Sequence, residues 1–397
     1  MKDVGERADV VVVGGGAAGN AAARTLRAQG FDGRVVLVHG EDGQPYLRTL
    51  VSKAIVQGLL TAEQAALPSH EGVEVVRGRA VGLHPARPGL VLDDGRELEA
   101  GALVLATGAM PRPAPADRGA RPPARVGAAG APRVVHLHTP QDADHLRALL
   151  GPEPSGRTVT VLGAGFVGSE TAAWLADVGA SVHLVARSRL PLARALGSAV
   201  AAAVAHQQGD RIATFFGHHV ESVTEHRESV TVRLDDGTGL ESDLAVVAHG
   251  TVPDAAWAGA QPDGLAVDDR LGVVAAPGRY AAGAVALHTD RHGGAYRTDH
   301  WDAAVAQGAH VARVVLRDLV GAPDPGPYVP DAGFSLSLYG IQVTGLGVPV
   351  PGAVEQHRRL DGGGVMTEFR LDGDLVAVTG VGATREVSAL RPDLRRP

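Results

Sequence analysis

The stretch Asp9-Val10-Val11-Val12-Val13-Gly14-Gly15-Gly16-Ala17-Ala18-Gly19-Asn20 organises the rest of this chain. Four consecutive valines favour a buried parallel strand that is covered on both faces. The glycines at 14, 16 and 19 form a G-x-G-x-x-G pattern. Gly14 allows a tight turn, Gly16 lets the backbone approach a pyrophosphate, and Gly19 lets the helix pack close to the strand. A helix that begins here offers free N–H groups to a phosphate, so the stretch predicts a dinucleotide site.

The residues that follow complete one strand–helix–strand unit. The pattern predicts a helix over 17–29 and a second strand over 34–38, about the thirty residues that such a unit needs. Glu41 lies just beyond that strand, 22 residues after Gly19. A carboxylate at this place can accept hydrogen bonds from both ribose hydroxyls of an adenosine. The alternative is a glycine-rich turn without a ligand.

The composition excludes several classes of protein. The chain of 397 residues is long enough for two or three domains. It contains no cysteine, which rules out disulfides, thiolate metal sites and cysteine nucleophiles. Its 37 basic and 44 acidic residues give a net charge of −7, which disfavours a nucleic-acid partner. No apolar run reaches the roughly 20 residues of a membrane span, and no signal pattern stands at the N-terminus, so we expect a cytoplasmic protein.

The opening pattern occurs a second time, which indicates an internal repeat. Residues 159–162 form an apolar run, glycines follow at 163, 165 and 168, and a further strand is predicted over 181–185. Hairpin signals and small-residue turns accompany both copies. Two nucleotide-binding modules in one chain predict an α/β fold with two Rossmann-like domains.

The remaining segments suggest how these modules are connected. Residues 111–132 are rich in Pro, Ala, Gly and Arg and predict a linker or surface loop. A helix is predicted over 302–320. After the proline-rich segment 323–327, strands are predicted over 365–371 and 375–381, which indicates a small α+β domain at 326–397.

With these motifs in order, the chain resembles the FAD-dependent pyridine-nucleotide oxidoreductases of the ferredoxin, rubredoxin and putidaredoxin reductase type. The resemblance extends over residues 8–391. It includes the stretch Pro45–Lys53, which is similar to the family's P-Y-x-R-P-x-L-S-K, and an Ala106-Thr107-Gly108 turn. His249–Asp254 resembles the crossover that returns the chain to the first domain.

The resemblance implies two cofactors and an assignment of domains. FAD would bind to a discontinuous domain of residues 1–115 and 250–322, and NAD(P)H to an inserted domain of residues 132–249. The FAD set would be Gly14, Gly16, Ala17, Ala18, Gly19, Glu41, Arg48, Lys53, Val81, Ala106, Thr107, Gly108, His138, Gly250, Gly283, Ala284 and Trp301. The NAD(P) set would be Gly163, Gly165, Phe166, Val167, Gly168, Arg187 and Arg189.

The resemblance also implies the chemistry. Hydride would pass from the nicotinamide to the flavin, and electrons would then leave singly to a ferredoxin-like iron–sulfur protein. Lys53 and Glu170 would form the catalytic pair, since the family places a carboxylate close to that lysine and to the nicotinamide. Without cysteine the chain cannot act as a disulfide reductase on the same scaffold.

The sequence departs from the family pattern at the flavin end. A Gly-Asp pair is usual where this chain has Gly283-Ala284, and an arginine is common where His138 stands. Residues 335–338 lack an aromatic and two polar residues of the family's wall near the flavin. The loss of one charge-assisted hydrogen bond weakens FAD binding by about 1.5–3 kcal/mol, and we still expect FAD to bind.

The second module departs in a way that favours NADPH. NAD-preferring members carry Glu at the end of the strand after the second glycine motif, whereas this chain has Ala186-Arg187-Ser188-Arg189. Guanidinium groups without a nearby acid suit a 2′-phosphate. The two arginines could equally be solvated surface charges.

Two other functions remain open at this point. The altered wall would suit a flavoenzyme that acts on a small organic substrate, and a redox-inactive paralogue would bind the nucleotides without turnover. The pairs His136/His138, His218/His219 and His288/His292 have no cysteine beside them, and we expect no metal site. A monomer and a homodimer are both compatible with the sequence.

Overall fold

The computed structural model describes residues 6–115, 132–289, 294–330 and 333–395. The chain divides into two compact units, each made of segments that are distant in sequence. The first contains Met1–Arg48, Thr61–Met110 and Val252–Ala332, and the second contains Thr49–Leu60, Pro111–Thr251 and Gly333–Pro397.

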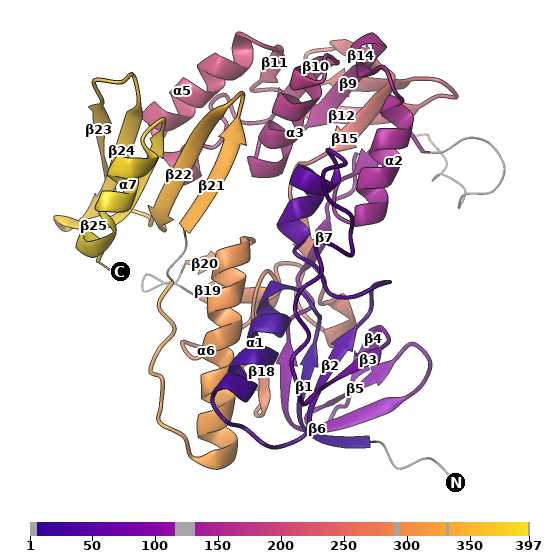
Figure 1. The fold of residues 1–397 in the computed structure, drawn as a ribbon, viewed down its shortest axis with the longest axis vertical. Helices are drawn as coiled ribbons and strands as arrows, with labels where there is room; N and C mark the ends of the chain where they lie inside the picture. The colour runs from indigo at the N-terminus through magenta and orange to yellow at the C-terminus, as the bar shows by residue number, and fades with distance from the viewer. Residues whose placement is uncertain (1–5, 116–131, 290–293, 331–332, 396–397) are drawn as a thin grey trace. The chain divides into compact units, whose positions relative to one another are not determined.

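The first unit is built on a seven-stranded sheet (Figure 1). Its parallel part has the order β3-β2-β1-β6, and β18 adds a short parallel pairing to the end of β6. The four valines of β1 are almost fully buried, as a strand covered on both faces requires. The strands are β1 (Glu6–Val13), β2 (Val35–His39), β3 (Val73–Arg77), β6 (Glu97–Leu105) and β18 (Arg279–Ala281), with an antiparallel extension from β5 (Gly89–Leu92) and β4 (Ala80–Leu83).

Two helices of the first unit, α1 (Ala17–Ala28) and α6 (Trp301–Val320), lie side by side (Figure 1). Their approach depends on a glycine, because a Cβ atom on Gly308 would lie 2.0 Å from the carbonyl oxygen of Ala18. The contact therefore fixes α6 directly against the first turn of α1. Three shorter strands, β17 (Leu265–Ala266), β19 (Ala286–Thr289) and β20 (Ala295–Tyr296), form a separate small sheet.

The second unit contains a five-stranded parallel sheet in the order β11-β10-β9-β15-β8. The strands are β8 (Val134–His136), β9 (Thr158–Leu162), β10 (Ser181–Ala186), β11 (Ala213–Phe216) and β15 (Leu244–Val247). The helices are α2 (Pro140–Leu150), α3 (Phe166–Asp177), the short α4 (Ala193–Leu196) and α5 (Ser198–Gly209), and a meander of β12 (Val220–Glu225), β13 (Val230–Leu234) and β14 (Gly239–Ser242) follows.

The C-terminal segment adds an antiparallel sheet to the same unit, in the order β21-β22-β25-β24-β23. It shares a hydrophobic cluster with α4 and α5, in which Leu196 and Val200 meet Leu336 and Val343. The buried hydroxyl of Thr379 also donates to the carbonyl oxygen of Leu196 at 2.5 Å. The elements are β21 (Gly333–Leu338), β22 (Ile341–Gly347), β23 (Val354–Arg359), β24 (Val365–Leu371), β25 (Asp374–Val381) and α7 (Thr384–Ala389).

The structure confirms the predicted α/β fold with two Rossmann-like sheets and a further α+β segment. The predicted helices over 17–29 and 302–320 are present with boundaries shifted by one residue. Three of the five C-terminal strands, β21, β22 and β23, were not predicted. Most of the predicted linker, residues 116–131, lies outside the described residues, and the predicted three-domain division stays a prediction.

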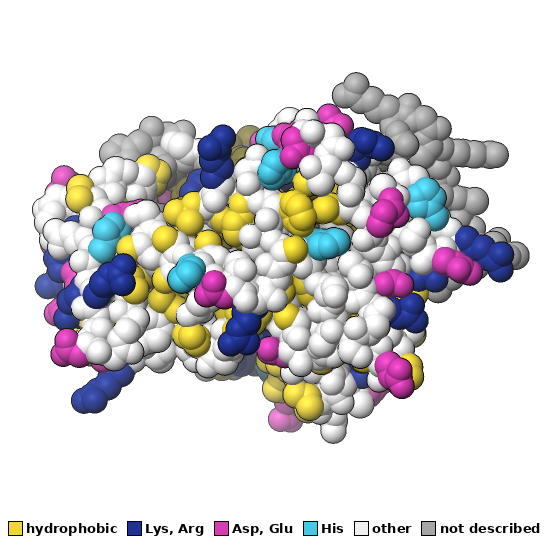
Figure 2. All heavy atoms as spheres, turned by 90° about the horizontal axis from the view of Figure 1, so that it is seen from above, with side chains coloured by type: hydrophobic (Ala, Val, Ile, Leu, Met, Phe, Trp, Pro, Cys, Tyr) yellow, Lys and Arg dark blue, Asp and Glu magenta, His cyan; other side chains and the backbone are white. Residues whose placement is uncertain are grey.

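The surface carries charges of both signs. On the face shown in Figure 2, acidic and basic side chains are interspersed with uncharged ones. This mixture agrees with the modest net charge of −7. Among the helices that the structure describes, none combines the length and apolar character needed to span a bilayer.

Candidate dinucleotide sites and the Lys53–Glu170 pair

The first glycine loop joins β1 to α1 and has the geometry of a phosphate-binding turn. Gly14 has a φ of +107°, and a Cβ there would lie 2.3 Å from the carbonyl oxygen of Ala106. A Cβ on Gly19 would lie 1.8 Å from the oxygen of Gly14, so only glycine allows α1 to pack this closely. Gly16, by contrast, faces open space and caps a helix whose first turn receives no side-chain cap. The N–H groups of residues 17–19 remain available to an anion.

The second glycine loop, between β9 and α3, repeats this construction. Gly163 has a φ of +108° and packs against the carbonyl of Ala248. A Cβ on Gly168 would again lie 1.8 Å from the oxygen of the first glycine of the loop. Gly165 faces open space and caps α3 without a side-chain partner. Phe166 and Val167 begin the helix, and in both loops a Cβ on the middle glycine would meet nothing within 4 Å.

Glu41 follows β2 and belongs to a polar cluster with Tyr46 and Arg48. The Tyr46 hydroxyl donates to Glu41 Oε2 at 2.7 Å, and the Arg48 guanidinium pairs with Oε1. Arg48 also donates to the Tyr46 hydroxyl at 2.8 Å and lies over its ring. Burial alone would raise the pKa of Glu41, but Arg48 and Tyr46 outweigh it and hold the pKa below the usual value. The carboxylate is thus kept ionised, with acceptor capacity left for ribose hydroxyls.

Two features of this cluster were not among the predicted site residues. Tyr46 was quoted only as part of the P-Y motif, although its position two residues before Arg48 could have suggested it. The buried imidazole of His39 packs over Gly15, where a Cβ would lie 2.7 Å from Nδ1. Burial lowers the pKa of His39, so this side chain is uncharged near neutral pH. Arg48, predicted as a FAD-binding residue, has its guanidinium engaged with Glu41.

The turn at Ala106-Thr107-Gly108 follows β6 at the same edge of the sheet. The Thr107 hydroxyl donates to the carbonyl oxygen of Asp254 at 2.5 Å, and the Asp254 N–H donates to Gly108 at 3.0 Å. These bonds fix the turn beside the first glycine loop. Val81 lies on β4 with 48% of its surface exposed, and Gly250, in the second unit, makes a turn after β15.

The turn at Gly283-Ala284 offers backbone groups only. The Gly283 N–H donates to the buried Gln307 side chain at 2.7 Å, and Arg297 donates to the Ala284 carbonyl at 3.0 Å. A methyl group stands where the related proteins are expected to carry a carboxylate. Trp301 is the first residue of α6, beyond the N-cap His300. Glu41 and the first glycine loop therefore suit a dinucleotide such as FAD, and the predicted flavin end at Gly283-Ala284 provides fewer polar contacts.

Lys53 and Glu170 lie together, as the resemblance implied. Lys53 Nζ is 3.1 Å from Glu170 Oε1, and the same oxygen accepts the backbone N–H of Ser337 at 3.2 Å. Lys53 interrupts the helical geometry of the π-helix Val51–Ile55. Burial raises the pKa of Glu170, and the opposing effects of Lys53 and Ser337 do not cancel it. Ser337 was not among the predicted site residues, because it contacts Glu170 through its backbone N–H and not through its side chain.

The basic residues predicted for a 2′-phosphate lie at the carboxyl end of β10. Arg187 and Arg189 are exposed immediately after the strand. The stem of Arg189 passes over Gly217, where a Cβ would lie 2.9 Å from Arg189 Cγ. The Arg189 side chain therefore lies along the end of the neighbouring parallel strand β11. His138, in the second unit, follows β8 and donates its backbone N–H to Asp142 at 3.0 Å.

The histidine pairs show one cluster with ligand-type atoms. His218 Nδ1 lies 3.4 Å from Asp235 and 3.6 Å from Asp236. His218 is half-buried and both carboxylates are exposed. His219 is not part of this group of three. His292 lies outside the described residues.

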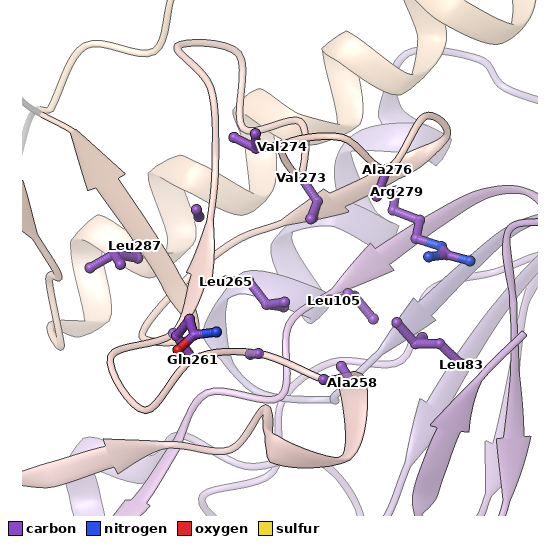
Figure 3. A pocket seen from close by; sticks show the side chains of 14 residues that line it. Leu83, Leu105, Ala258, Gln261, Leu265, Val273, Val274, Ala276, Arg279 and Leu287 are labelled. Atoms are coloured by element: carbon purple, nitrogen blue, oxygen red, sulfur yellow. The ribbon is translucent and has the colours of Figure 1, made fainter. Parts of the chain in front are cut away.

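A cavity of about 250 Å³ lies elsewhere in the first unit (Figure 3). Leu83, Leu105, Leu265 and Val273 line it with other mostly aliphatic residues, and Arg279 stands at one side. No predicted cofactor residue is among the described residues that line it.

Comparison with known proteins shows the family. The sequence model of the pyridine nucleotide-disulphide oxidoreductases matches residues 8–308. The chain is 31% identical over 391 residues to the chlorobenzene dioxygenase ferredoxin reductase component of Cupriavidus sp. (strain PS12), covering 95% of this chain and 90% of that protein. It is 32% identical over 278 residues to putidaredoxin reductase of Pseudomonas putida, covering 66% and 62% of the two chains.

Solved structures give the same result. A ferredoxin reductase from Rhodopseudomonas palustris has a TM-score of 0.81 at 26% identity, covering 96% of this chain and 93% of that one. The covalent putidaredoxin reductase–putidaredoxin complex gives 0.82 at 25% identity, with 97% and 92% covered. The chain belongs to the pyridine nucleotide-disulphide oxidoreductase family. It is an oxidoreductase whose relatives include ferredoxin reductases, which confirms the resemblance seen in the sequence.

Proposed function

We propose that this protein is a flavoprotein reductase that takes hydride from NAD(P)H and passes electrons to a ferredoxin-like iron–sulfur protein. The observation that carries the proposal is the presence of two glycine loops of the same construction together with the Lys53–Glu170 pair. The names of the relatives, which include ferredoxin reductase components, support the choice of electron acceptor. The absence of cysteine directs the chemistry away from disulfide substrates.

The first loop is assigned to FAD. The N–H groups after Gly16 would hold the pyrophosphate, and the ionised Glu41 would accept the ribose hydroxyls. Arg48 and Tyr46 keep Glu41 ionised and fix its orientation. The discontinuous segment 1–115 and 250–322 would form this domain, with Thr107 and Trp301 at its carboxyl edge.

The second loop is assigned to NADPH. The segment 132–249 would form this domain, and residues 326–397 the C-terminal one. The N–H groups after Gly165 would hold the pyrophosphate. Arg187 and Arg189, exposed at the end of β10 where an acid would select NADH, would pair with the 2′-phosphate.

The Lys53–Glu170 pair would provide the electrostatic environment of the reaction. When bound, a flavin supplies the capacity to accept hydride and release single electrons. Lys53 places a positive charge beside Glu170, and their ion pair holds both side chains in one orientation. Glu170 is the more buried partner, with 10% of its side chain exposed against 38% for Lys53, so the carboxylate has lost more of its hydration than the ammonium group.

The test is a cofactor analysis of the purified full-length protein. Flavin released by heat should be FAD, and the protein should absorb near ~450 nm before release. Anaerobic NADPH should bleach this band, and a ferredoxin should restore it. A protein that cannot be loaded with FAD would contradict the proposal. Bleaching without reoxidation by ferredoxins would favour a flavoenzyme with a small organic substrate.

A further inference from the structure

Strand β21 of the C-terminal sheet contacts one face of α3 at two places. Phe166 and Glu170 are four residues apart on α3 and therefore lie on the same side of the helix. The rings of Phe166 and Phe334 have centroids 4.9 Å apart with an interplanar angle of 48°. The N–H of Ser337 donates to Glu170 Oε1 at 3.2 Å. Strand β21, which belongs to the C-terminal sheet, thus contacts α3, the helix that begins at the second glycine loop.

The Ser337 contact follows from the position of β21 at the edge of its sheet. In an antiparallel ladder the backbone groups of alternate residues point toward the neighbouring strand or away from it. Ser337 uses its N–H for Glu170, so this group points away from β22. A side chain of α3 therefore satisfies a donor that an edge strand would otherwise present to solvent.

The Phe334 contact depends on a glycine in the neighbouring strand. Phe334 pairs with Gly345 of β22 in the antiparallel register. A Cβ on Gly345 would lie 2.2 Å from the Phe334 ring, so the ring lies directly across this glycine. Gly345 thereby determines where the Phe334 ring can lie, and that ring packs against Phe166.

We propose that β21 is a positioning element of the pyridine-nucleotide site, in which the Ser337 N–H orients Glu170 and the Phe334 ring orients Phe166. This inference rests on the proposed function, because it takes Glu170 and the second loop to serve the nicotinamide half of the site. Glu170 Oε1 carries two donors, Lys53 Nζ and the Ser337 N–H, which limits rotation of the carboxylate. Ser337 and Phe334 act through other residues and are positioning residues.

A purely structural role of Ser337 would not change the pKa of Glu170, so this pKa distinguishes a positioning role from a structural one. The charged group that faces it is Lys53 from the π-helix, and β21 presents the uncharged Ser337 N–H. Both stabilise the ionised carboxylate, whereas burial opposes ionisation. Removing the N–H should therefore raise the pKa of Glu170 further, by about one pH unit for a donor to a charged acceptor.

The test replaces Ser337 by proline, which removes the N–H and keeps the strand. Proline is tolerated on an edge strand where the N–H points away from the sheet. G333P is the matched control, since Gly333 lies four residues earlier on β21, has the same outward orientation of its N–H, and does not belong to the predicted flavin wall of residues 335–338. The Glu170 carboxyl is titrated by ¹³C NMR in the full-length holoprotein, with Glu170→Gln to assign its resonance.

We expect S337P to raise the midpoint of the Glu170 titration and to move the acidic limb of flavin reduction by NADPH in the same direction. G333P should leave both unchanged. Equal midpoints in S337P and the wild type, with native thermal stability, would overturn the inference. If the wild type is reduced by neither NADPH nor NADH, the proposed function fails, and the titration still tests the contact independently.

A second pair of variants keeps the inference falsifiable if S337P does not fold. Phe334→Leu should raise the KM for NADPH several-fold and weaken NADP⁺ binding, with kcat nearly unchanged. Phe369→Leu, a buried phenylalanine of β24 in another cluster of the same sheet, is the control. An equal effect of both substitutions on KM would show a general loss of packing and would overturn the role of Phe334.

Discussion

Gly168 packs against Gly163 so closely that a Cβ on Gly168 would lie 1.8 Å from the Gly163 carbonyl oxygen. The corresponding pair in the first loop, Gly19 and Gly14, gives the same distance. In both loops the middle glycine faces open space instead. The two glycine loops, about 150 residues apart, thus have the same close contact between their first and third glycines, and both are open at the middle glycine.

Gly168→Ala should therefore destabilise the second unit and weaken nucleotide binding. The added methyl meets a backbone oxygen that cannot move without displacing β9 or α3, and overpacking of this kind costs about 1–3 kcal/mol. We expect a clear fall in Tm and a loss of NADP⁺ affinity in titration. Gly156→Ala, at a position in the same unit where a Cβ meets nothing within 4 Å, is the control and should leave both unchanged.

Glu41→Gln should remove a pH-dependent part of the stability of the first unit. The pKa of Glu41 is lowered in the folded state, so its contribution is present above the unfolded pKa of about 4.3 and is lost as the pH falls through the folded pKa. With a third of the side chain exposed, the effect should be about 0.5–1 kcal/mol. Chemical unfolding of the apoprotein from pH 7 to pH 3 measures it.

The control for Glu41 is Glu97→Gln, since Glu97 is an exposed residue of the same unit on β6. The difference between wild type and Glu41→Gln should shrink on acidification, and the Glu97→Gln protein should follow the wild type throughout. A difference that grows as the pH falls would contradict the direction of the shift.

The arginines after β10 make a prediction about coenzyme choice. Replacing Arg187 and Arg189 together by alanine should lower kcat/KM for NADPH by about ten-fold or more, because charge-assisted hydrogen bonds to a phosphate are lost. The value for NADH should change little. Arg194→Ala, at an exposed position nearby, should leave the NADPH/NADH ratio unchanged. A wild-type preference for NADH would show that both arginines are only surface charges.

Ala284→Asp tests the end of the first site that provides few polar contacts to a cofactor. A carboxylate at this turn should bind a flavin side-chain hydroxyl and lower the Kd for FAD by about ten-fold. In the apoprotein the same buried charge should lower the Tm, because it has lost water without gaining the ligand. Ala284→Asn, with similar volume and no charge, should gain less affinity. Unchanged Kd values in both would place the flavin chain away from Ala284.

The local elements followed from the sequence because their signals are local. The valine run, the glycine spacing and the position of Glu41 predict a strand, a turn, a helix and an acceptor within about thirty residues. The repeat at 159–187 predicted the second sheet in the same way. Strands β21 to β23 were missed, although Phe334, Leu336 and Leu338 of β21 alternate with polar residues. Only β23 (Val354–Arg359) is mostly exposed and shows no apolar alternation.

The sequence by itself determined the fold class, the two glycine loops and the exclusion of thiol chemistry, since each depends on residue type and short-range spacing. The resemblance implied one long-range pair, Lys53 and Glu170, which are 117 positions apart. Tertiary structure alone decided that Arg48 turns to Glu41 and that Ser337 reaches Glu170 from 167 positions away. The Ser337 contact uses a backbone N–H that every residue but proline carries, so no residue pattern could have predicted it. Its position depends on an edge strand that packs on α3.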